Sequence, residues 1–299
     1  MQSALSTAMG LEEQLSGWTG PSSDYEKEKQ ERTERMIRQA VDAHTAFNEC
    51  SVKVYTKGSY ANNTNVRADS DVDIAVECTE AEYWKEAQPG FYKPHGPYQG
   101  IWTPAKLRSE LVSALRETFT GQVDESGSTA IKVRSGSARV DADVVPCFSY
   151  RYYFESISLL GTKIFKTDGG SLVNYPTQQL ENGVAKNNRT GYAYKKGVRL
   201  LKRVENAMAE DGTFHELPSF FMECLAFNCP DSIFGESSWT GCLRAMLAHI
   251  WQQLQGDEPA NGRWVEANDC FYLFHSGQKW SRADGRDFAY AAWNYFGFK

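Results

Sequence analysis

Two short segments in which aspartates alternate with apolar residues constrain the fold most. The first runs from Asp71 to Ile74 and the second from Asp141 to Val145. Side chains two positions apart on a β-strand point to the same face of the sheet. The alternation therefore predicts two strands, each with a buried apolar face and with two carboxylates on its other face.

Two carboxylates on one face repel each other. Unless a cation lies between them, one is pushed toward protonation, so we expect such a pair to bind divalent metal or to titrate as a coupled dyad. Carboxylate oxygens favour Mg²⁺ or Mn²⁺ over zinc. Three convergent carboxylates can hold two such ions, which activate a hydroxyl and neutralise a departing pyrophosphate. We predict that Asp71 and Asp73 provide two of these carboxylates, and that Asp141 or Asp143 provides the third.

Gly58 and Ser59 precede the first aspartate segment by eleven residues. A glycine lets the backbone approach a phosphate closely, and a serine adds a hydroxyl donor. Together with the carboxylates, this pattern predicts a nucleotidyl-transfer site with a nucleoside triphosphate as substrate. The alternative is that the aspartates belong to solvated turns.

A run of basic residues lies further along the chain. Seven lysines and arginines and no acidic residue occur between residues 186 and 203. Within this run, Lys195, Arg199 and Lys202 fall at i, i+4 and i+7, so a helix would gather them into one stripe. We predict that this stripe binds a triphosphate, and the alternative is a solvated helix face.

These motifs resemble the polymerase-beta-type nucleotidyltransferase superfamily and, within it, the cGAS/DncV-like nucleotidyltransferases (CD-NTases) of bacterial anti-phage signalling. The resemblance is carried by Gly58-Ser59, Asn62-Asn63-Thr64, Ser70-Asp71-Val72-Asp73-Ile74 and Asp143-Val144-Val145-Pro146. It implies an α+β fold, in which a mixed-sheet palm with a long N-terminal helix is followed by a helical lobe, with the active site in the cleft between them. It also implies that Asp143 is the third carboxylate, that Lys202 binds triphosphate, and that Ser219, with Glu223 behind it, is a further nucleotide-binding residue.

The resemblance further implies the reaction. Nucleoside triphosphates would be joined through a linear intermediate into a cyclic di- or oligonucleotide, with two Mg²⁺ or Mn²⁺ ions per site. The product would activate a downstream effector protein in anti-phage (CBASS) signalling. The alternatives are a superfamily enzyme that modifies tRNA, protein or a small molecule, and a non-catalytic nucleotide-binding scaffold.

Periodicity predicts the order of the elements. We expect a helix over residues 24–47, strands at 51–55, 72–76, 130–134 and 139–148, and a long loop over 84–103 followed by a helix over 107–119. A meander should then span 150–175, with a turn at 167–170, and the chain should be helical from residue 178 onward. We therefore predict a palm domain over residues 1–180 and a helical lobe over 181–299, with residues 1–20 ordered only if another part of the chain holds them.

The composition narrows the classes of partner. The chain has 32 basic and 38 acidic residues, a net charge of −6, which disfavours a protein that tracks long nucleic acid. No apolar run approaches the roughly 20 residues that a membrane helix needs. We expect a cytoplasmic monomer whose seven cysteines are free thiols.

Overall fold

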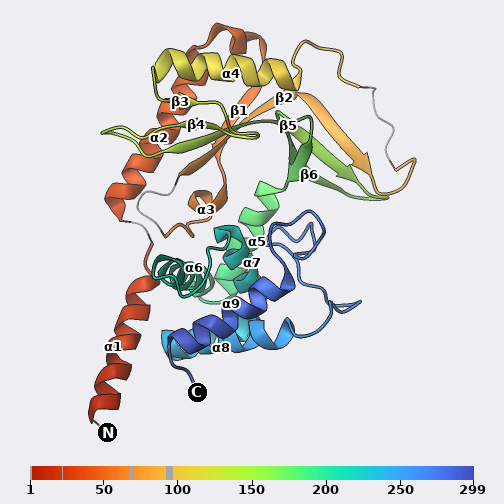
Figure 1. Cartoon of the computed structure of the whole chain (residues 1–299). Coiled ribbons are helices and arrows are strands. Elements are labelled where there is room, and N and C mark those ends of the chain that lie inside the picture. Colours follow the sequence, from red (N-terminus) through yellow and green to blue (C-terminus); the bar gives the residue numbers. More distant parts are fainter. Residues whose placement is uncertain (1, 22, 67–70, 92–96) are drawn as a thin grey trace. The chain divides into compact units, whose positions relative to one another are not determined.

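A computed structural model of the chain describes residues 2–21, 23–66, 71–91 and 97–299, with only the backbone of residues 2–9 (Figure 1). The chain divides into two compact units. We call residues Ser22–Ala61 and Arg67–Thr177 the sheet unit, and residues Met1–Pro21, Asn62–Val66 and Gln178–Lys299 the helical unit. Each unit has its own hydrophobic core. Ser70 of the sequence motif and part of the expected loop over 84–103 lie outside the described residues.

Strands dominate the sheet unit. They are β1 (Val52–Thr56), β2 (Val72–Glu86), β3 (Val123–Asp124), β4 (Ile131–Val133), β5 (Ala142–Tyr153), β6 (Ser158–Phe165) and β7 (Ser171–Asn174). Its helices are α2 (Asp24–Ala43), the short 3-10 helix η1 (Thr45–Glu49), α3 (Gly58–Ala61) and α4 (Pro104–Thr118). Among the described residues the sheet has the order β1-β2-β5-β4-β3, and β6 and β7 extend it from the later half of β5.

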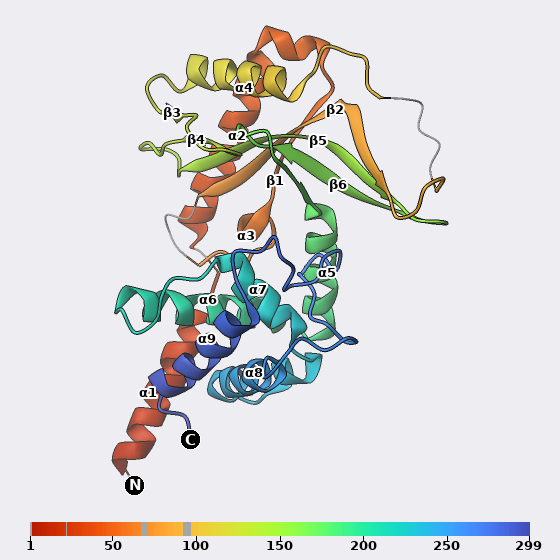
Figure 2. The ribbon, with the colours of Figure 1, turned by 45° about the vertical axis from the view of Figure 1, so that its right-hand side comes forward.

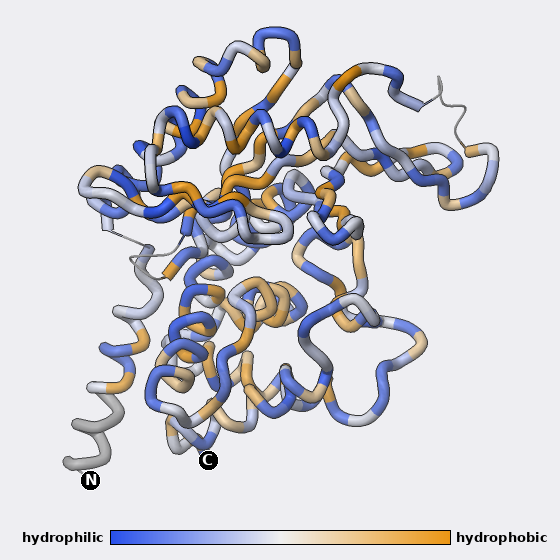
Figure 3. The backbone as a smooth tube through the Cα atoms, turned by 45° about the horizontal axis from the view of Figure 1, so that its top comes forward, coloured by the Kyte–Doolittle hydropathy of each residue, from blue (hydrophilic) through white to orange (hydrophobic). Residues whose placement is uncertain are grey.

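The sheet is mixed, because β2 and β5 run parallel while the other pairs are antiparallel. Helices α2 and α4 cover one of its faces (Figures 1 and 2). Val72, Ile74 and Val144 are fully buried in the core beneath these helices. Hydrophobic positions accordingly recur along the strands in Figure 3. The predicted α+β class and the strands around 72–76 and 139–148 are confirmed, although β2 continues to Glu86, where we expected a loop from residue 84.

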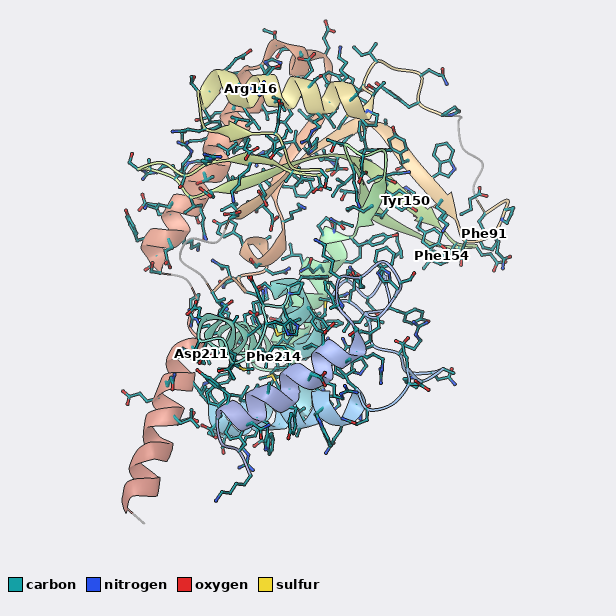
Figure 4. All side chains as sticks on the ribbon, viewed as in Figure 1. Phe91, Arg116, Tyr150, Phe154, Asp211 and Phe214 are labelled. Atoms are coloured by element: carbon teal, nitrogen blue, oxygen red, sulfur yellow. The ribbon has the colours of Figure 1, made fainter. Side chains whose placement is uncertain are left out.

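The helical unit contains α1 (Gln2–Trp18), α5 (Pro176–Arg189), α6 (Tyr194–Glu210), α7 (Ser219–Asn228), the 3-10 helix η2 (Asp231–Gly235), α8 (Trp239–Gln253) and α9 (Arg282–Tyr295). Its core is lined by apolar side chains from α1, α6, α7, η2, α8 and α9. Asp211 and Phe214, labelled in Figure 4, follow the end of α6. The ring of Phe214 packs edge-on against that of Phe288 in α9, with 6.2 Å between centroids. None of the helices in the described part of the chain has the length and hydropathy that crossing a bilayer requires.

The N-terminal 21 residues differ from the expectation, because they belong to the helical unit and not to the palm. Leu15 is fully buried in the helical core. The carboxylate of Glu12 accepts hydrogen bonds of 2.8 Å from the backbone N–H groups of Trp239 and Thr240, and one of 2.6 Å from the Thr240 hydroxyl. These N–H groups at the start of α8 have no partner inside the helix, so a carboxylate from α1 satisfies them. The long helix expected over 24–47 is α2, followed by η1.

Replacing Glu12 with alanine should destabilise the protein by about 1 to 2 kcal/mol, because charge-assisted bonds to a helix N-terminus are lost. Burial raises the pKa of Glu12, but the hydrogen bonds from Thr240 and Trp239 outweigh it and lower the pKa overall. The stabilisation is therefore present above the ordinary carboxyl pKa and is lost as the pH falls through the lowered value. Thermal unfolding across pH checks this.

The neighbouring Glu13 provides the matched control, since its side chain is exposed on the same helix. A Glu13→Ala variant that lost as much stability as Glu12→Ala would contradict the capping role.

Candidate active site

A row of charged side chains crosses the sheet on the face opposite α2 and α4. In the parallel pair of β2 and β5, Asp73 lies opposite Asp143. In the antiparallel pair of β4 and β5, Lys132 lies opposite the same Asp143. Neighbouring strands are about 4.8 Å apart, so the three side chains stand next to one another. The register therefore brings together two carboxylates that are 70 residues apart in the chain and adds a lysine beside them.

Gly58 lies against the Asp73 carboxylate. The backbone N–H of Lys57 donates to the Asp73 carbonyl over 2.9 Å and extends the β1–β2 ladder by one position. Gly58 follows with a φ of +68° and begins the short helix α3, which also contains Ser59. A Cβ on Gly58 would overlap with Oδ2 of Asp73. Only glycine fits this position, both for its backbone conformation and for its closeness to the carboxylate.

Burial and neighbouring carboxylates destabilise the charged forms of Asp73 and Asp143. Burial raises the pKa of Asp73, and the nearby Asp71 raises it further, while Lys57 opposes the change. Burial also raises the pKa of Asp143, helped by Asp71 and Asp73 and partly offset by Lys132 and Lys57. A positive charge placed between these groups would relieve both effects.

Asp71 and Asp141 are both engaged by Lys132. Its Nζ lies 2.9 Å from Oδ2 of Asp71 and 3.5 Å from Oδ2 of Asp141. The backbone N–H of Ser135 donates to the other oxygen of Asp141. Burial raises the pKa of Asp141, but the hydrogen bonds from Ser135 and the charge of Lys132 outweigh it and lower the pKa overall. Because Asp141 is paired in this way and Asp143 faces Asp73, the geometry favours Asp143 as the third carboxylate.

The donor set fits a hard divalent cation, since Asp71, Asp73 and Asp143 supply only carboxylate oxygens and two of them are crowded together. Within the described ranges, however, no three Asp, Glu, His or Cys side chains are already gathered as a metal shell. The ion pair with Lys132 accounts for part of this, because it holds Oδ2 of Asp71. The two-ion site stays a prediction, and a metal ion there would compete with Lys132 for the Asp71 carboxylate.

The basic stripe predicted on α6 is largely buried inside the helical unit. The guanidinium of Arg199 donates to the backbone carbonyls of Thr19, over 2.7 Å, and Asn63, over 2.6 Å. Nζ of Lys202, a residue only 1% exposed, lies 3.2 Å from the Thr64 hydroxyl and 3.3 Å from Oε2 of Glu223. Neither side chain forms the solvated face that periodicity alone allows, because protein acceptors satisfy both charges.

Glu223 is the centre of this buried network. Its carboxylate also accepts hydrogen bonds from Thr64, over 2.9 Å, from Gln179, over 2.8 Å, and from Asn62, over 3.4 Å. Burial lowers the pKa of Lys202, and the charge of Glu223 opposes this change. The network ties segment Asn62–Val66, which follows α3 in the chain, to helices α5, α6 and α7.

The other two predicted phosphate-binding residues of the helical unit are more accessible. Lys195 is half-buried near the start of α6, and burial lowers the pKa of its amine. Ser219 is exposed and is the first residue of α7. Four residues of this part of the sequence were predicted to bind phosphate. A ligand would have to displace the contacts described above to reach Arg199 or Lys202, but it can reach Lys195 and Ser219 without displacing any of those contacts.

Lys132 and Lys57 were absent from the residues predicted to form the site. A signal for Lys132 exists in the sequence, because the segment Ile131-Lys132-Val133 alternates in the same way as the aspartate segments. Ile131 and Val133 are fully buried, and this places Lys132 on the carboxylate face. What the sequence alone does not provide is the pairing of this strand with β5.

Replacing Glu223 with alanine should reduce the free energy of unfolding by about 3 to 5 kcal/mol, because it leaves the Lys202 ammonium buried without its counter-charge. The double variant Lys202→Met with Glu223→Leu should lose less, since it removes both buried charges. Denaturant unfolding measures both effects. Glu210, an exposed residue of the same unit, provides the control variant Glu210→Ala. Equal losses of unfolding free energy in Glu223→Ala and Glu210→Ala would show that the network does not stabilise the protein.

Comparisons with known proteins identify the family of the chain. Residues 181–297 match the model of the cGAS/DncV-like nucleotidyltransferase C-terminal helical domain. The chain is 33% identical to a cyclic dipyrimidine nucleotide synthase CdnE of Cecembia lonarensis, over 96% of this chain and 98% of the relative. It is 35% identical to a protein of the same name from Legionella pneumophila, over 93% and 95%. It is 32% identical to a cyclic dipurine nucleotide synthase of Elizabethkingia meningoseptica, over 96% and 99%.

Solved structures give the same result for the fold. The CdnE cyclic dinucleotide synthase of Elizabethkingia meningoseptica, solved with GTP and Apcpp, has a TM-score of 0.80 at 31% identity, covering 96% of this chain and 99% of its own. The CdnE c-UMP-AMP synthase of Rhodothermus marinus, solved with Apcpp and Upnpp, has a TM-score of 0.83 at 27% identity, covering 96% and 98%. From the carboxylate pair beside Gly58 and from this similarity along the chain, we conclude that the protein belongs to the cGAS/DncV-like nucleotidyltransferases.

Proposed function

We propose that this protein is a metal-dependent, template-independent nucleotidyltransferase that joins nucleoside triphosphates into a cyclic di- or oligonucleotide and releases pyrophosphate. The observation that carries the proposal is the placement of Asp73 opposite Asp143, with Gly58 against the Asp73 carboxylate. Relatives that match nearly the whole chain at 32 to 35% identity are named as cyclic nucleotide synthases, which supports this reaction.

The roles follow from the chemistry of each side chain. Two Mg²⁺ or Mn²⁺ ions, when bound, supply the charge that lowers the pKa of an acceptor hydroxyl and neutralises the leaving pyrophosphate. Asp71 and Asp73 would hold both ions, and Asp143 would complete the one on the acceptor side. The backbone at Gly58 and the hydroxyl of Ser59 would hold phosphate oxygens.

The candidate triphosphate ligands of the helical unit differ in how accessible their side chains are. Lys195 and Ser219 keep accessible donors, so we propose that these two bind the triphosphate directly. Lys202 and Arg199 would bind it only after exchanging Glu223 or a backbone carbonyl for phosphate. In the present arrangement their contribution is to hold segment Asn62–Val66.

The proposal also covers the nucleotides that the enzyme uses and the partners with which it works. Three relatives of nearly equal identity are named for dipyrimidine or dipurine products, so the proposal covers cyclic nucleotides as a class. The substrates are nucleoside triphosphates, and the product acts on a downstream effector protein of anti-phage signalling. We propose that the enzyme works as a cytoplasmic monomer.

Incubation with all four nucleoside triphosphates and Mg²⁺ or Mn²⁺ should give phosphatase-resistant cyclic products. Replacing Asp71 and Asp73 together with asparagine, or Asp143 alone, should reduce their formation by about a thousandfold or more, because the ligands of the ions are lost. Asp42→Asn, at an exposed position of α2, should leave the rate unchanged. Label transferred to RNA or protein in place of cyclic products, or an active double variant, would contradict the proposal.

Gly58→Ala should reduce the rate by about a hundredfold, because its methyl group would displace the Asp73 carboxylate. Gly121→Ala is the matched control: Gly121 also has a positive φ, of +73°, but a Cβ there meets no atom within 4 Å. Both variants lose about 1 kcal/mol of stability to backbone strain. Steady-state kinetics separates them, and equal rates for the two would refute the role of the close contact.

A further inference from the structure

Lys132 occupies an unusual position for a cation beside a metal-binding site. It projects from β4, directly opposite Asp143, and its Nζ is shared between Asp71 and Asp141 at 2.9 and 3.5 Å. Its side chain is 41% exposed, so solvent and ions reach the amine. The Lys132 ammonium thus contacts the carboxylate of Asp71, which the proposed reaction requires as a metal ligand.

The ammonium and a divalent cation would compete for the same carboxylate. Oδ2 of Asp71 is within hydrogen-bond distance of Nζ, and a metal ion bound by that oxygen would lie within a few ångströms of the amine. Two positive charges this close repel strongly in a partly desolvated site. Metal binding at Asp71 therefore favours movement of the ammonium away from this carboxylate.

Asp141 offers the place to which the ammonium can move. One of its oxygens accepts the backbone N–H of Ser135, which holds the carboxylate in place whether or not the lysine contacts Asp71. The other oxygen already faces Nζ at 3.5 Å. The four-carbon stem of lysine rotates freely, while the register of β4 on β5 keeps its backbone fixed. A small rotation is then enough to transfer the ammonium from Asp71 to Asp141.

We propose that Lys132 is a positioning residue that competes with divalent metal for Asp71, and that Asp141 accepts its ammonium when metal binds. The pair of Lys132 and Asp141 thereby sets the metal concentration at which the enzyme becomes active. This inference rests on the proposed function, because it takes Asp71 as a metal ligand. It gives Asp141 a role distinct from that of Asp143.

The test is Mn²⁺ binding to the full-length protein without nucleotide, measured by calorimetry and by the loss of the free-Mn²⁺ paramagnetic resonance signal. Lys132→Met should bind Mn²⁺ about tenfold more tightly, because the competing charge is gone. Asp141→Asn should bind it several-fold more weakly, since the carboxylate that accepts the ammonium in place of Asp71 is then gone. Lys132→Met combined with Asp141→Asn should match Lys132→Met within about twofold, because Asp141 acts through the lysine.

The double variant separates this exchange from a general charge effect. If Asp141 acted only by its negative charge, removing it would weaken Mn²⁺ binding equally with and without Lys132, and the inference would be refuted. Arg134→Met removes a positive charge just after the same strand, from a side chain paired with Asp124 at 3.7 Å. Equal tightening by Arg134→Met and Lys132→Met would also refute it.

Asp73→Asn separates the inference from the proposed function. This variant should lose Mn²⁺ binding, and if it binds as well as the natural protein, or if the natural protein binds none, the proposed site itself is wrong. If Asp73→Asn loses binding but Lys132→Met leaves the affinity unchanged, the site stands and the competition is refuted. In turnover assays, Lys132→Met should lower the Mg²⁺ concentration for half-maximal rate by a similar factor, a shift that a purely structural role for Lys132 would not produce.

Discussion

The burial of two neighbouring carboxylates, Asp73 and Asp143, is the constraint on which the arrangement of charges on this face of the sheet depends. The parallel pairing of β2 with β5 places them opposite each other, and burial on the same face raises the pKa of both. Carboxylates whose pKa values are raised in this way cluster at functional sites. Three neighbouring residues accommodate this pair. Lys132 lies opposite Asp143, and Lys57 lies opposite Asp73 on the other side. Gly58 leaves the Asp73 carboxylate the space that a Cβ would take.

In the helical unit, the charges that must be compensated are those of buried basic side chains. Lys202 is fully buried, and it is tolerated there because Glu223 and the Thr64 hydroxyl supply the interactions that water would have provided. Arg199 is accommodated in the same way by backbone carbonyls. The consequence is that segment Asn62–Val66, which begins three residues after Ser59 in the chain, is held by an internal network of charges. Residues that the sequence suggests as phosphate ligands therefore have a structural task in the conformation described.

Much of the site was predictable because its geometry is local. The alternation around Asp71 and Asp141 decides which side chains share a face, since successive residues of any strand point to opposite sides. The same reasoning applied to Ile131-Lys132-Val133 would have placed Lys132 on the carboxylate face. The stripe of Lys195, Arg199 and Lys202 is a local pattern too, but Arg199 and Lys202 are buried. Helical periodicity says which residues share a face and not what covers that face.

The sequence by itself determined the strand faces, the helical final third and the residue types of the candidate site, because these depend on neighbours in the chain. Tertiary structure alone decided that Asp143 lies opposite Asp73, that Lys132 is shared between Asp71 and Asp141, and that residues 1–21 belong to the helical unit. The reason is physical: strand register, the burial of a charge and the partner that compensates it result from contacts between segments far apart in the chain. No local pattern encodes which segment will supply that partner.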